Sequence, residues 1–227
     1  MREIVVDTET TGLDPLHGHR IVEVGCVELY NRIPTGETFH YYLNPERDMP
    51  AEAFAVHGLS REFLLDKPCF SELAEALLDF IGEAPLIIHN AGFDLAFLNA
   101  EFERCGHPLI RRERLVDTLM LARRKYPAGP NRLDDLCIRY RIDNSRRSKH
   151  GALLDAELLA EVYIDLIGAR QAQLGLIEDA AGFGINFGGL VPARPRPSPL
   201  PSRLRDDDVA AHHAFLATLG DKAIWRD

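Results

Sequence analysis

The sequence predicts an α/β protein in which helices flank a mixed β-sheet. Branched and aromatic residues fill short runs in the first third of the chain, and turn signals separate these runs. Further along, an apolar run of strand length alternates with helical apolar patterns. Strands first, followed by strand–helix alternation, are typical of a mixed sheet covered by helices.

The elements follow from local patterns. Strands are expected at residues 4–6, 20–31, 39–45 and 85–90, with the turn PTGE before the third. A helix is expected after Ser71 as its N-cap, because Leu73, Leu77, Leu78 and Ile81 form an apolar stripe. Further helices are expected at residues 91–106, at 116–126, at 132–140 with Asn131 as N-cap, and at 151–168.

Composition and charge limit the class of protein. The 227 residues are 46% hydrophobic and 27% charged, and no apolar run approaches the roughly 18 residues of a membrane span. The four cysteines form no CxxC pair and lie among apolar neighbours, which favours reduced core residues in a cytoplasmic protein without membrane contact. The net charge of −9 opposes broad binding to nucleic acid, so stable residence on duplex DNA would need a partner.

Three regions are expected along the chain. Residues 1–173 carry the strand and helix patterns of a folded domain, and residues 174–201 are rich in glycine and then proline, as in a linker. Residues 202–227 regain a helical apolar pattern through Val209, Phe215, Leu216 and Leu219. A short amphipathic segment beyond a linker is expected to dock on a partner, although folding back onto the domain is the alternative.

Two carboxylates stand at the end of the first expected strand, in the sequence IVVDTETTGLD. Asp7 and Glu9 are two positions apart, so a strand points both to the same face. Like charges this close raise one another's pKa unless a cation lies between them. A strand that simply ends in a polar turn at Gly12 is the alternative.

A third carboxylate lies on the apolar face of the last long helix. At about 100° per residue, Leu159, Val162 and Leu166 share a face with Asp155, whereas Glu157, Glu161 and Asp165 lie opposite. A buried carboxylate needs a cation or strong donors, and a structural salt bridge would also satisfy it.

Asp94 and His150 complete the set of candidate catalytic residues. Asp94 falls in the first turn of a helix, where a carboxylate is also favoured without any function. His150 lies in a polar loop before the last long helix, where it could reach Asp155 and act as a base, or could merely be solvated. Four acids from three segments, with one histidine, are what phosphodiester hydrolysis with two divalent ions requires, and Mg²⁺ or Mn²⁺ suits oxygen ligands.

These residues resemble the three motifs of the DEDDh 3′–5′ exonucleases. The resemblance rests on DTETTG, EAFAVHGL, REFLLDKPCF, HNAGFD, RIDNSRRSKHGALLDAELLAEVY and the terminal AIWRD, and spans nearly the whole chain. It implies a ribonuclease-H-like fold with Asp7 between two metal ions, Glu9 and Asp155 at one, Asp94 at the other, and His150 as general base. It also implies that Thr10, Glu52 and His57 contact the terminal nucleotide, together with Asp7, Glu9 and Asp155.

The resemblance is closest to the proofreading members of the family, and this implies partners. These are DNA 3′ ends, the alpha subunit of DNA polymerase III on the C-terminal tail, the sliding clamp, and a small theta-like subunit. QAQLGL resembles a weak clamp motif, with Gln171, Leu174 and Leu176 as contacts, although an ordinary helix end fits as well. Arg146, Arg147 and Lys149 are expected to steer phosphates.

The predicted function is removal of mispaired 3′-terminal nucleotides from DNA, with release of nucleoside 5′-monophosphates. An exonuclease of the same family that trims RNA would keep the chemistry, but the linker and tail favour a polymerase subunit. A structural subunit without catalysis is a third reading, which the complete carboxylate set opposes.

Overall fold

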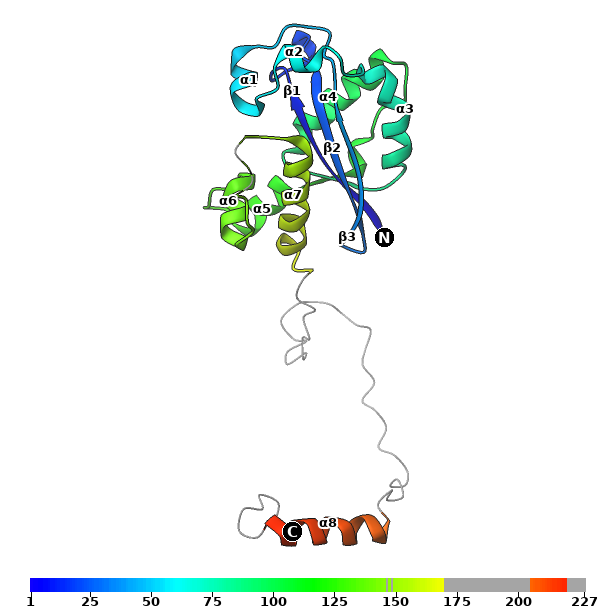
Figure 1. Cartoon of the computed structure of the whole chain (residues 1–227), viewed down its shortest axis with the longest axis vertical. Helices are drawn as coiled ribbons and strands as arrows, with labels where there is room; N and C mark the ends of the chain where they lie inside the picture. The colour runs from blue at the N-terminus through cyan, green and yellow to red at the C-terminus, as the bar shows by residue number, and fades with distance from the viewer. Residues whose placement is uncertain (146, 148, 170–204, 220–227) are drawn as a thin grey trace, which may run out of the picture. The chain divides into compact units, whose positions relative to one another are not determined.

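A computed structural model of the chain describes residues 1–145, 147, 149–169 and 205–219 (Figure 1). The chain divides into two compact units, Met1–Leu174 and Gly175–Asp227. All of the expected catalytic residues belong to the first unit.

The first unit is built on a five-stranded sheet with the strand order β3-β2-β1-β4-β5. The strands are β1 (Arg2–Thr10), β2 (Ile21–Tyr30), β3 (Ile33–Tyr42), β4 (Leu86–Ile88) and β5 (Leu115–Asp117). β2 is antiparallel to β1 and β3, whereas β4 pairs in parallel with both β1 and β5. This confirms the predicted mixed sheet.

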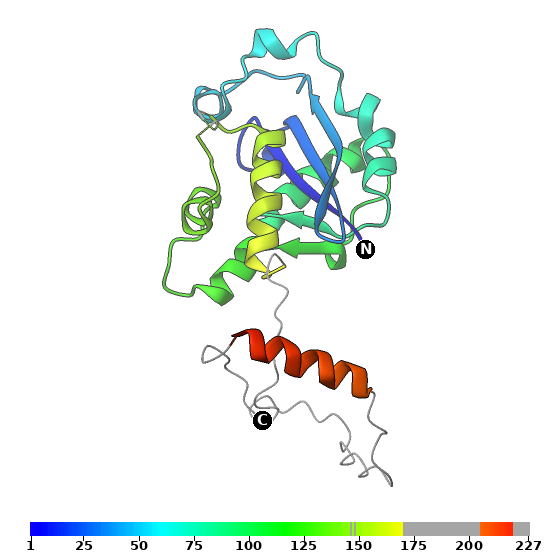
Figure 2. The same cartoon turned by 60° about the horizontal axis from the view of Figure 1, so that its bottom comes forward.

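Helices cover both faces of the sheet (Figures 1 and 2). They are α1 (Ala51–His57), α2 (Arg61–Leu64), α3 (Phe70–Ile81), α4 (Ala91–Arg104), α5 (Thr118–Lys125), α6 (Leu133–Tyr140) and α7 (Ala152–Leu166), with short 3-10 turns η1 (Pro15–His17) and η2 (Arg112–Arg114). Figure 2 shows α7 running across the strands.

Alternate residues of β1 enter two separate hydrophobic cores. Ile4 and Val6 pack with α3 and α4 on one face, and Val5 packs with α5, α6 and α7 on the other. Because side chains alternate along a strand, Asp7 and Glu9 fall on the face of α7, and Thr8 falls on the face of α4. The pattern that builds the core therefore also aims the carboxylates.

The polarity of α7 agrees with its predicted phase. Asp155 and Leu159 are buried at 2% and 1% exposure, and Glu161 is exposed on the opposite side. The helix presents a carboxylate to the sheet rather than to solvent.

Four local expectations were wrong. The sequence PTGE, expected as a turn, lies inside β3, and the chain turns instead at Asn31 and Arg32, whose φ angles are 51° and 67°. Residues Leu115–Asp117 form β5, so the helix predicted at 116–126 begins only at Thr118, where the Asp117 side chain accepts from the N–H of Leu119. The N-cap of α3 is Cys69 rather than Ser71, because the Glu72 carboxylate accepts a hydrogen bond from the Cys69 N–H at 2.7 Å. The N-cap of α6 is Arg132, whose N–H donates to Asp135, so Asn131 stands one residue before the cap.

The second unit contains α8 (Asp206–Leu219), a helix within the segment 202–227 where the sequence predicts a helical pattern. Three aspartates occupy its first turn, where negative charge stabilises a helix, and Phe215 is 57% exposed. None of the helices in the described part of the chain combines the length and apolar character that crossing a bilayer requires.

Candidate active site

The site begins where β1 leaves the core. Asp7 pairs with Gly25 of β2 and Glu9 pairs with Glu23, after which the register shifts at Thr10. Glu9 is only 8% exposed. The two carboxylates thus emerge side by side at the carboxyl end of the central strand, as the strand periodicity predicts.

Gly25 lets α7 approach this end of the sheet. A Cβ atom on Gly25 would lie 2.3 to 2.4 Å from backbone atoms of Ala152 and Leu153, in the first turn of α7. The missing side chain therefore allows the helix backbone to lie on the strand beside Asp7, and brings Asp155 into the site. Sequence reasoning missed this residue, although a glycine inside a strand pattern is the signal for a close backbone approach.

Asp94 reaches the site from the other face. Asn90 follows β4 and is the N-cap of α4, with a left-handed backbone conformation at φ 65°. Asp94 therefore falls in the first turn of α4. The hydroxyl of Thr8 donates to Asp94 Oδ1 at 2.7 Å, and Asp94 is 4% exposed. Thr8 is a second residue that the sequence did not single out.

A cleft of about 830 Å³ contains all five predicted catalytic residues. It is lined by Asp7, Thr8, Glu9, Leu13, His89, Asn90, Phe93, Asp94, Leu119, Arg123, Gly129, Asn131, Arg132, Leu133, Asp134, Arg147, His150 and Asp155. Ligand atoms of Glu9, His150 and Asp155 lie within 4.8 Å of one another. The structure therefore brings the separate segments together, as expected.

The carboxylates of β1 and α4 resist ionisation. Burial, together with the charges of neighbouring carboxylates, raises the pKa of Glu9 to about 8 and holds the pKa of Asp7 well above its usual range. Burial raises the pKa of Asp94 to about 7, despite the opposing hydrogen bond from Thr8. The protein alone thus provides too little positive charge for this group of acids.

This arrangement fits divalent metal ions. Oxygen ligands that converge from three elements, with elevated pKa values, are the donor set of a site that a hard cation completes. Asp7, Glu9, Asp94 and Asp155 are the residues that would hold the ions.

Asp155 differs from the other three because it has a cationic partner. Nε and Nη2 of Arg147 donate to its two oxygens at 2.5 and 2.7 Å, and His150 Nδ1 lies 3.4 Å from Oδ2. Although burial raises the pKa of Asp155, hydrogen bonds from His150 and Arg147 outweigh it and hold that pKa below its ordinary value. The salt bridge that the sequence left open as an alternative is thus present, and Arg147 is buried rather than free to steer phosphates.

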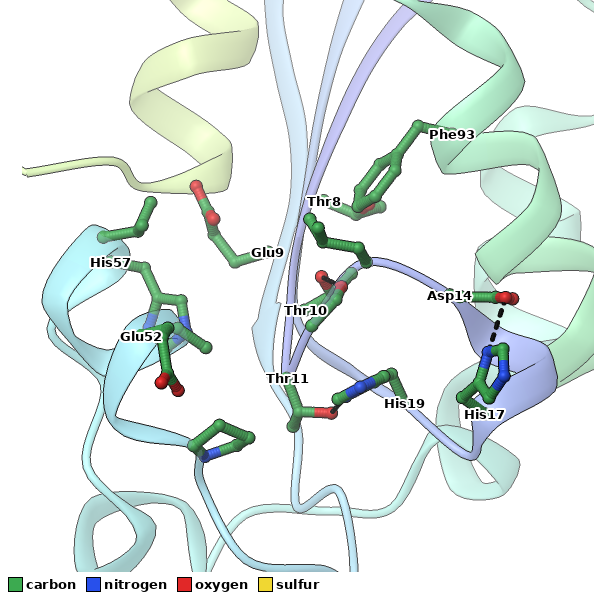
Figure 3. Close-up of a pocket in the computed structure, with 15 residues that line it drawn as sticks. Thr8, Glu9, Thr10, Thr11, Asp14, His17, His19, Glu52, His57 and Phe93 are labelled. Carbon is green, nitrogen blue, oxygen red and sulfur yellow. Dashed lines mark hydrogen bonds and ion pairs between the residues drawn. The ribbon is translucent and has the colours of Figure 1, made fainter.

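A second cavity, of about 580 Å³, adjoins the cleft through residues that line both, Thr8, Glu9, Leu13 and Phe93. Figure 3 shows Glu52 and His57 of α1 on one side of β1 and Phe93 of α4 on the other. Thr10, Glu52 and His57, the predicted substrate contacts, all line this cavity.

His57 is held in one neutral form. Its Nδ1 accepts a hydrogen bond from the Leu59 N–H at 3.0 Å, so Nε2 carries the proton. Burial lowers the pKa of His57, against the opposing effect of the Thr10 backbone, and its buried Nε2 makes no hydrogen bond of good geometry among the described residues. A buried donor at a cavity wall is suited to a polar ligand atom.

Other predicted contacts lie outside the described residues. These are Arg146, the clamp residues Gln171, Leu174 and Leu176, and the terminal AIWRD sequence.

Comparison with known proteins agrees with the geometry. A model of the exonuclease family matches residues 4–163, which include every predicted catalytic residue. The chain belongs to the exonuclease family. The family resemblance inferred from the sequence motifs is therefore confirmed.

Relatives of this chain include DNA polymerase III epsilon subunits. The chain is 52% identical to that of Rickettsia conorii over 184 residues, which cover 80% of each protein. It is 42% identical to that of Escherichia coli, with 99% of this chain and 97% of the relative covered.

Solved structures support the exonuclease fold at low identity. Exonuclease I matches with a TM-score of 0.64 and 18% identity, over 75% of this chain and 41% of that one. Exonuclease X, in complex with 5′ overhanging duplex DNA, matches with a TM-score of 0.56 and 24% identity, over 73% and 91% of the two chains. These likenesses show the fold alone.

Proposed function

We propose that this chain is the proofreading 3′–5′ exonuclease subunit of a bacterial DNA polymerase III. It removes mispaired 3′-terminal nucleotides from DNA and releases nucleoside 5′-monophosphates. The observation that carries the proposal is the acidic cleft at the end of β1, where Glu9, His150 and Asp155 converge beside a second cavity. The epsilon relatives, similar over most of this chain, support the same activity.

Two divalent ions, Mg²⁺ or Mn²⁺, are the proposed cofactors. Asp7 would serve both ions, Glu9 and Asp155 would complete one site, and Asp94 would serve the other. When bound, such ions activate water and stabilise the leaving oxygen of a phosphodiester.

The residues of the chain have separate proposed roles. His150, whose side chain is 48% exposed, accepts the proton of the water that attacks the terminal phosphodiester. Its backbone N–H donates to the Val56 carbonyl at 3.4 Å, which holds the residue between α7 and the cavity of α1. Thr8 fixes the carboxylate of Asp94 through its hydrogen bond.

The cavity beside the cleft is the proposed site of the terminal nucleotide. Leu13 and Phe93 offer apolar surface for a base, and Glu52 and the Nε2–H of His57 offer polar contacts. Thr10 contributes backbone groups at the floor. An unpaired end reaches this site at a lower cost of unpairing, which gives preference for mismatches.

The remaining partners are proposed from the function. The tail that contains α8 would bind the alpha subunit of the polymerase, and Gln171, Leu174 and Leu176 would touch the sliding clamp. A small theta-like subunit is a further candidate partner. Proofreading of bacterial DNA implies a cytoplasmic location.

The proposed function is tested by digestion of a 3′-labelled primer, paired or mispaired at its end, with Mg²⁺ and the isolated full chain. A matching RNA strand serves as the parallel substrate. Faster loss of the mispaired DNA end, with slow loss of RNA, is the expected result. Preference for RNA would show an RNA-trimming exonuclease, and no cleavage would show a structural subunit.

A further inference from the structure

Arg147 lies inside the cleft as a buried, fully paired cation. Its side chain is only 7% exposed, and its guanidinium binds Asp155 through two nitrogens. Nη1 donates to Asp134 at 2.5 Å, and Nη2 lies 2.8 Å from His150 Nδ1. One side chain thus joins a predicted metal ligand, the predicted base and an acid of α6.

The contacts of Arg147 use the oxygens that a metal ion would need. Both carboxylate oxygens of Asp155 accept from the guanidinium, in the bidentate geometry that arginine favours. Arg147 also lowers the pKa of Asp7 and Glu9, against the stronger effect of burial. Its charge cannot be removed by deprotonation, so the side chain must move before another cation can take its place.

We propose that Arg147 is a positioning residue that holds Asp155 and His150 in place before metal binds, and that leaves Asp155 when a divalent cation occupies the site. The guanidinium therefore competes with the metal and sets the metal affinity. This inference rests on the proposed function, because it assumes that Asp155 is a ligand. Its test uses metal binding without substrate, so it can fail while nuclease activity is intact.

Asp134 offers a second test, because competition by Arg147 and simple charge attraction predict opposite changes in metal affinity when Asp134 is replaced. It lies in the first turn of α6, and its side chain is 52% exposed. Removal of a negative charge near a cation site weakens metal binding by Coulomb's law alone. If Asp134 instead anchors Arg147 over Asp155, then Asp134→Asn releases the competitor and strengthens metal binding.

The experiment is calorimetric titration of the full chain with Mn²⁺ in the absence of DNA. For Arg147→Gln, Mn²⁺ affinity is expected to rise at least about tenfold, a change of about 1.4 kcal/mol. For Asp134→Asn, a rise of about threefold is expected, as a partial release. Lys149→Gln removes a like charge from an exposed side chain of the same segment, and is expected to change the affinity by less than about twofold because solvent screens it.

The measured Mn²⁺ affinities distinguish competition by Arg147 from a general effect of charge. Unchanged or weaker binding by Arg147→Gln would overturn the proposal, and so would weaker binding by Asp134→Asn. An equal gain for Lys149→Gln would also overturn it, since general charge would then explain the effect. Asp134→Asn decides the question if Arg147→Gln fails to fold, because Asp134 lies at the surface. Melting in EDTA provides a second readout, and Arg147→Gln is expected to melt at a lower temperature than wild type.

Discussion

Carboxylates lie at both ends of β1, but the chain pairs them at one end and gathers them at the other. Glu3, at the first end, is 1% exposed, accepts a hydrogen bond from the Tyr163 hydroxyl at 2.8 Å, and lies 3.1 Å from Nε of Arg32. At the second end, burial raises the pKa values of Asp7, Glu9 and Asp94, and the charges of neighbouring carboxylates raise those of Asp7 and Glu9 further.

The difference separates structural from functional carboxylates. The fold also pairs Glu101 with Arg20 through two hydrogen bonds, so it has a general means of neutralising buried acids. Acids left without such pairing reduce the free energy of unfolding, and a cation that binds them recovers it. The second end of β1 therefore lowers the free energy of unfolding of the metal-free protein and forms a site that a metal ion stabilises.

Asp7→Asn is expected to have the largest effect on activity. The variant keeps the shape of the side chain and removes its charge, so release of 3′-terminal nucleotides with Mg²⁺ should fall by at least about 10³-fold. Single-turnover digestion of a labelled primer measures this loss. Activity within about tenfold of wild type would remove Asp7 from the catalytic set.

His150→Ala is expected to lower the rate by about 10²–10⁴-fold, the usual contribution of a general base. Mn²⁺ should still bind, because the carboxylates are intact. Primer digestion measures the loss of rate, and titration with Mn²⁺ measures whether the metal still binds. A wild-type rate would refute the assignment of His150 as base.

Gly25→Ala is expected to act through the position of α7. The added methyl group would meet the helix backbone at 2.3 to 2.4 Å, so α7 must shift and carry Asp155 with it. Activity should fall by about 10²-fold, and the free energy of unfolding by about 1–3 kcal/mol.

Gly92→Ala is the matched control, on the first turn of α4, where a Cβ would meet nothing within 4 Å. It should change stability by less than about 1 kcal/mol, or increase it slightly. Equal losses from Gly25→Ala and Gly92→Ala would show that close packing at Gly25 is unimportant.

The stability of the metal-free protein should depend on pH in a defined direction. Glu9 and Asp94 have folded-state pKa values of about 8 and about 7, raised from 4.5 and 3.8. At a pH between the ordinary and the folded-state pKa of each group, the folded state holds a proton that the unfolded state has lost. The free energy of unfolding contributed by these two groups therefore falls as pH rises. Urea denaturation in EDTA at pH 5.5, 7 and 8.5 measures the decline, which Glu9→Gln should reduce. Equal slopes for wild type and Glu9→Gln would contradict the assigned shift of Glu9, and the comparison between them cancels the opposite contribution of His57, whose pKa burial lowers.

Much of this site follows from periodicity in the sequence. The alternation of β1 places Asp7 and Glu9 together, and the phase of α7 turns Asp155 toward the sheet, because both patterns are local. β5 was missed because its residues, Leu115–Asp117, run directly into the helical pattern of α5 and were counted with that helix.

The remaining features depend on contacts between distant segments. The need for Gly25 appears only when α7 lies on β2, and the Thr8–Asp94 hydrogen bond joins positions 86 residues apart. The pairing of Arg147 with Asp155 depends on the path of the loop before α7. The sequence placed Arg147 near the site as a phosphate-steering residue, whereas the structure pairs it with a predicted metal ligand.

The most direct test of the account compares the two ends of β1 by thermal melting in EDTA and in excess Mg²⁺. Asp7→Asn should melt above wild type in EDTA, since the folded state no longer buries a carboxyl group whose pKa is raised well above its usual range. It should melt below wild type in Mg²⁺, since the metal stabilises only an intact site. Glu3→Gln should melt below wild type in both, with a loss of about 1–3 kcal/mol, because it breaks a paired carboxylate. An Asp7→Asn variant that melts below wild type in both conditions would contradict the account, because Asp7 would then be a structural carboxylate like Glu3.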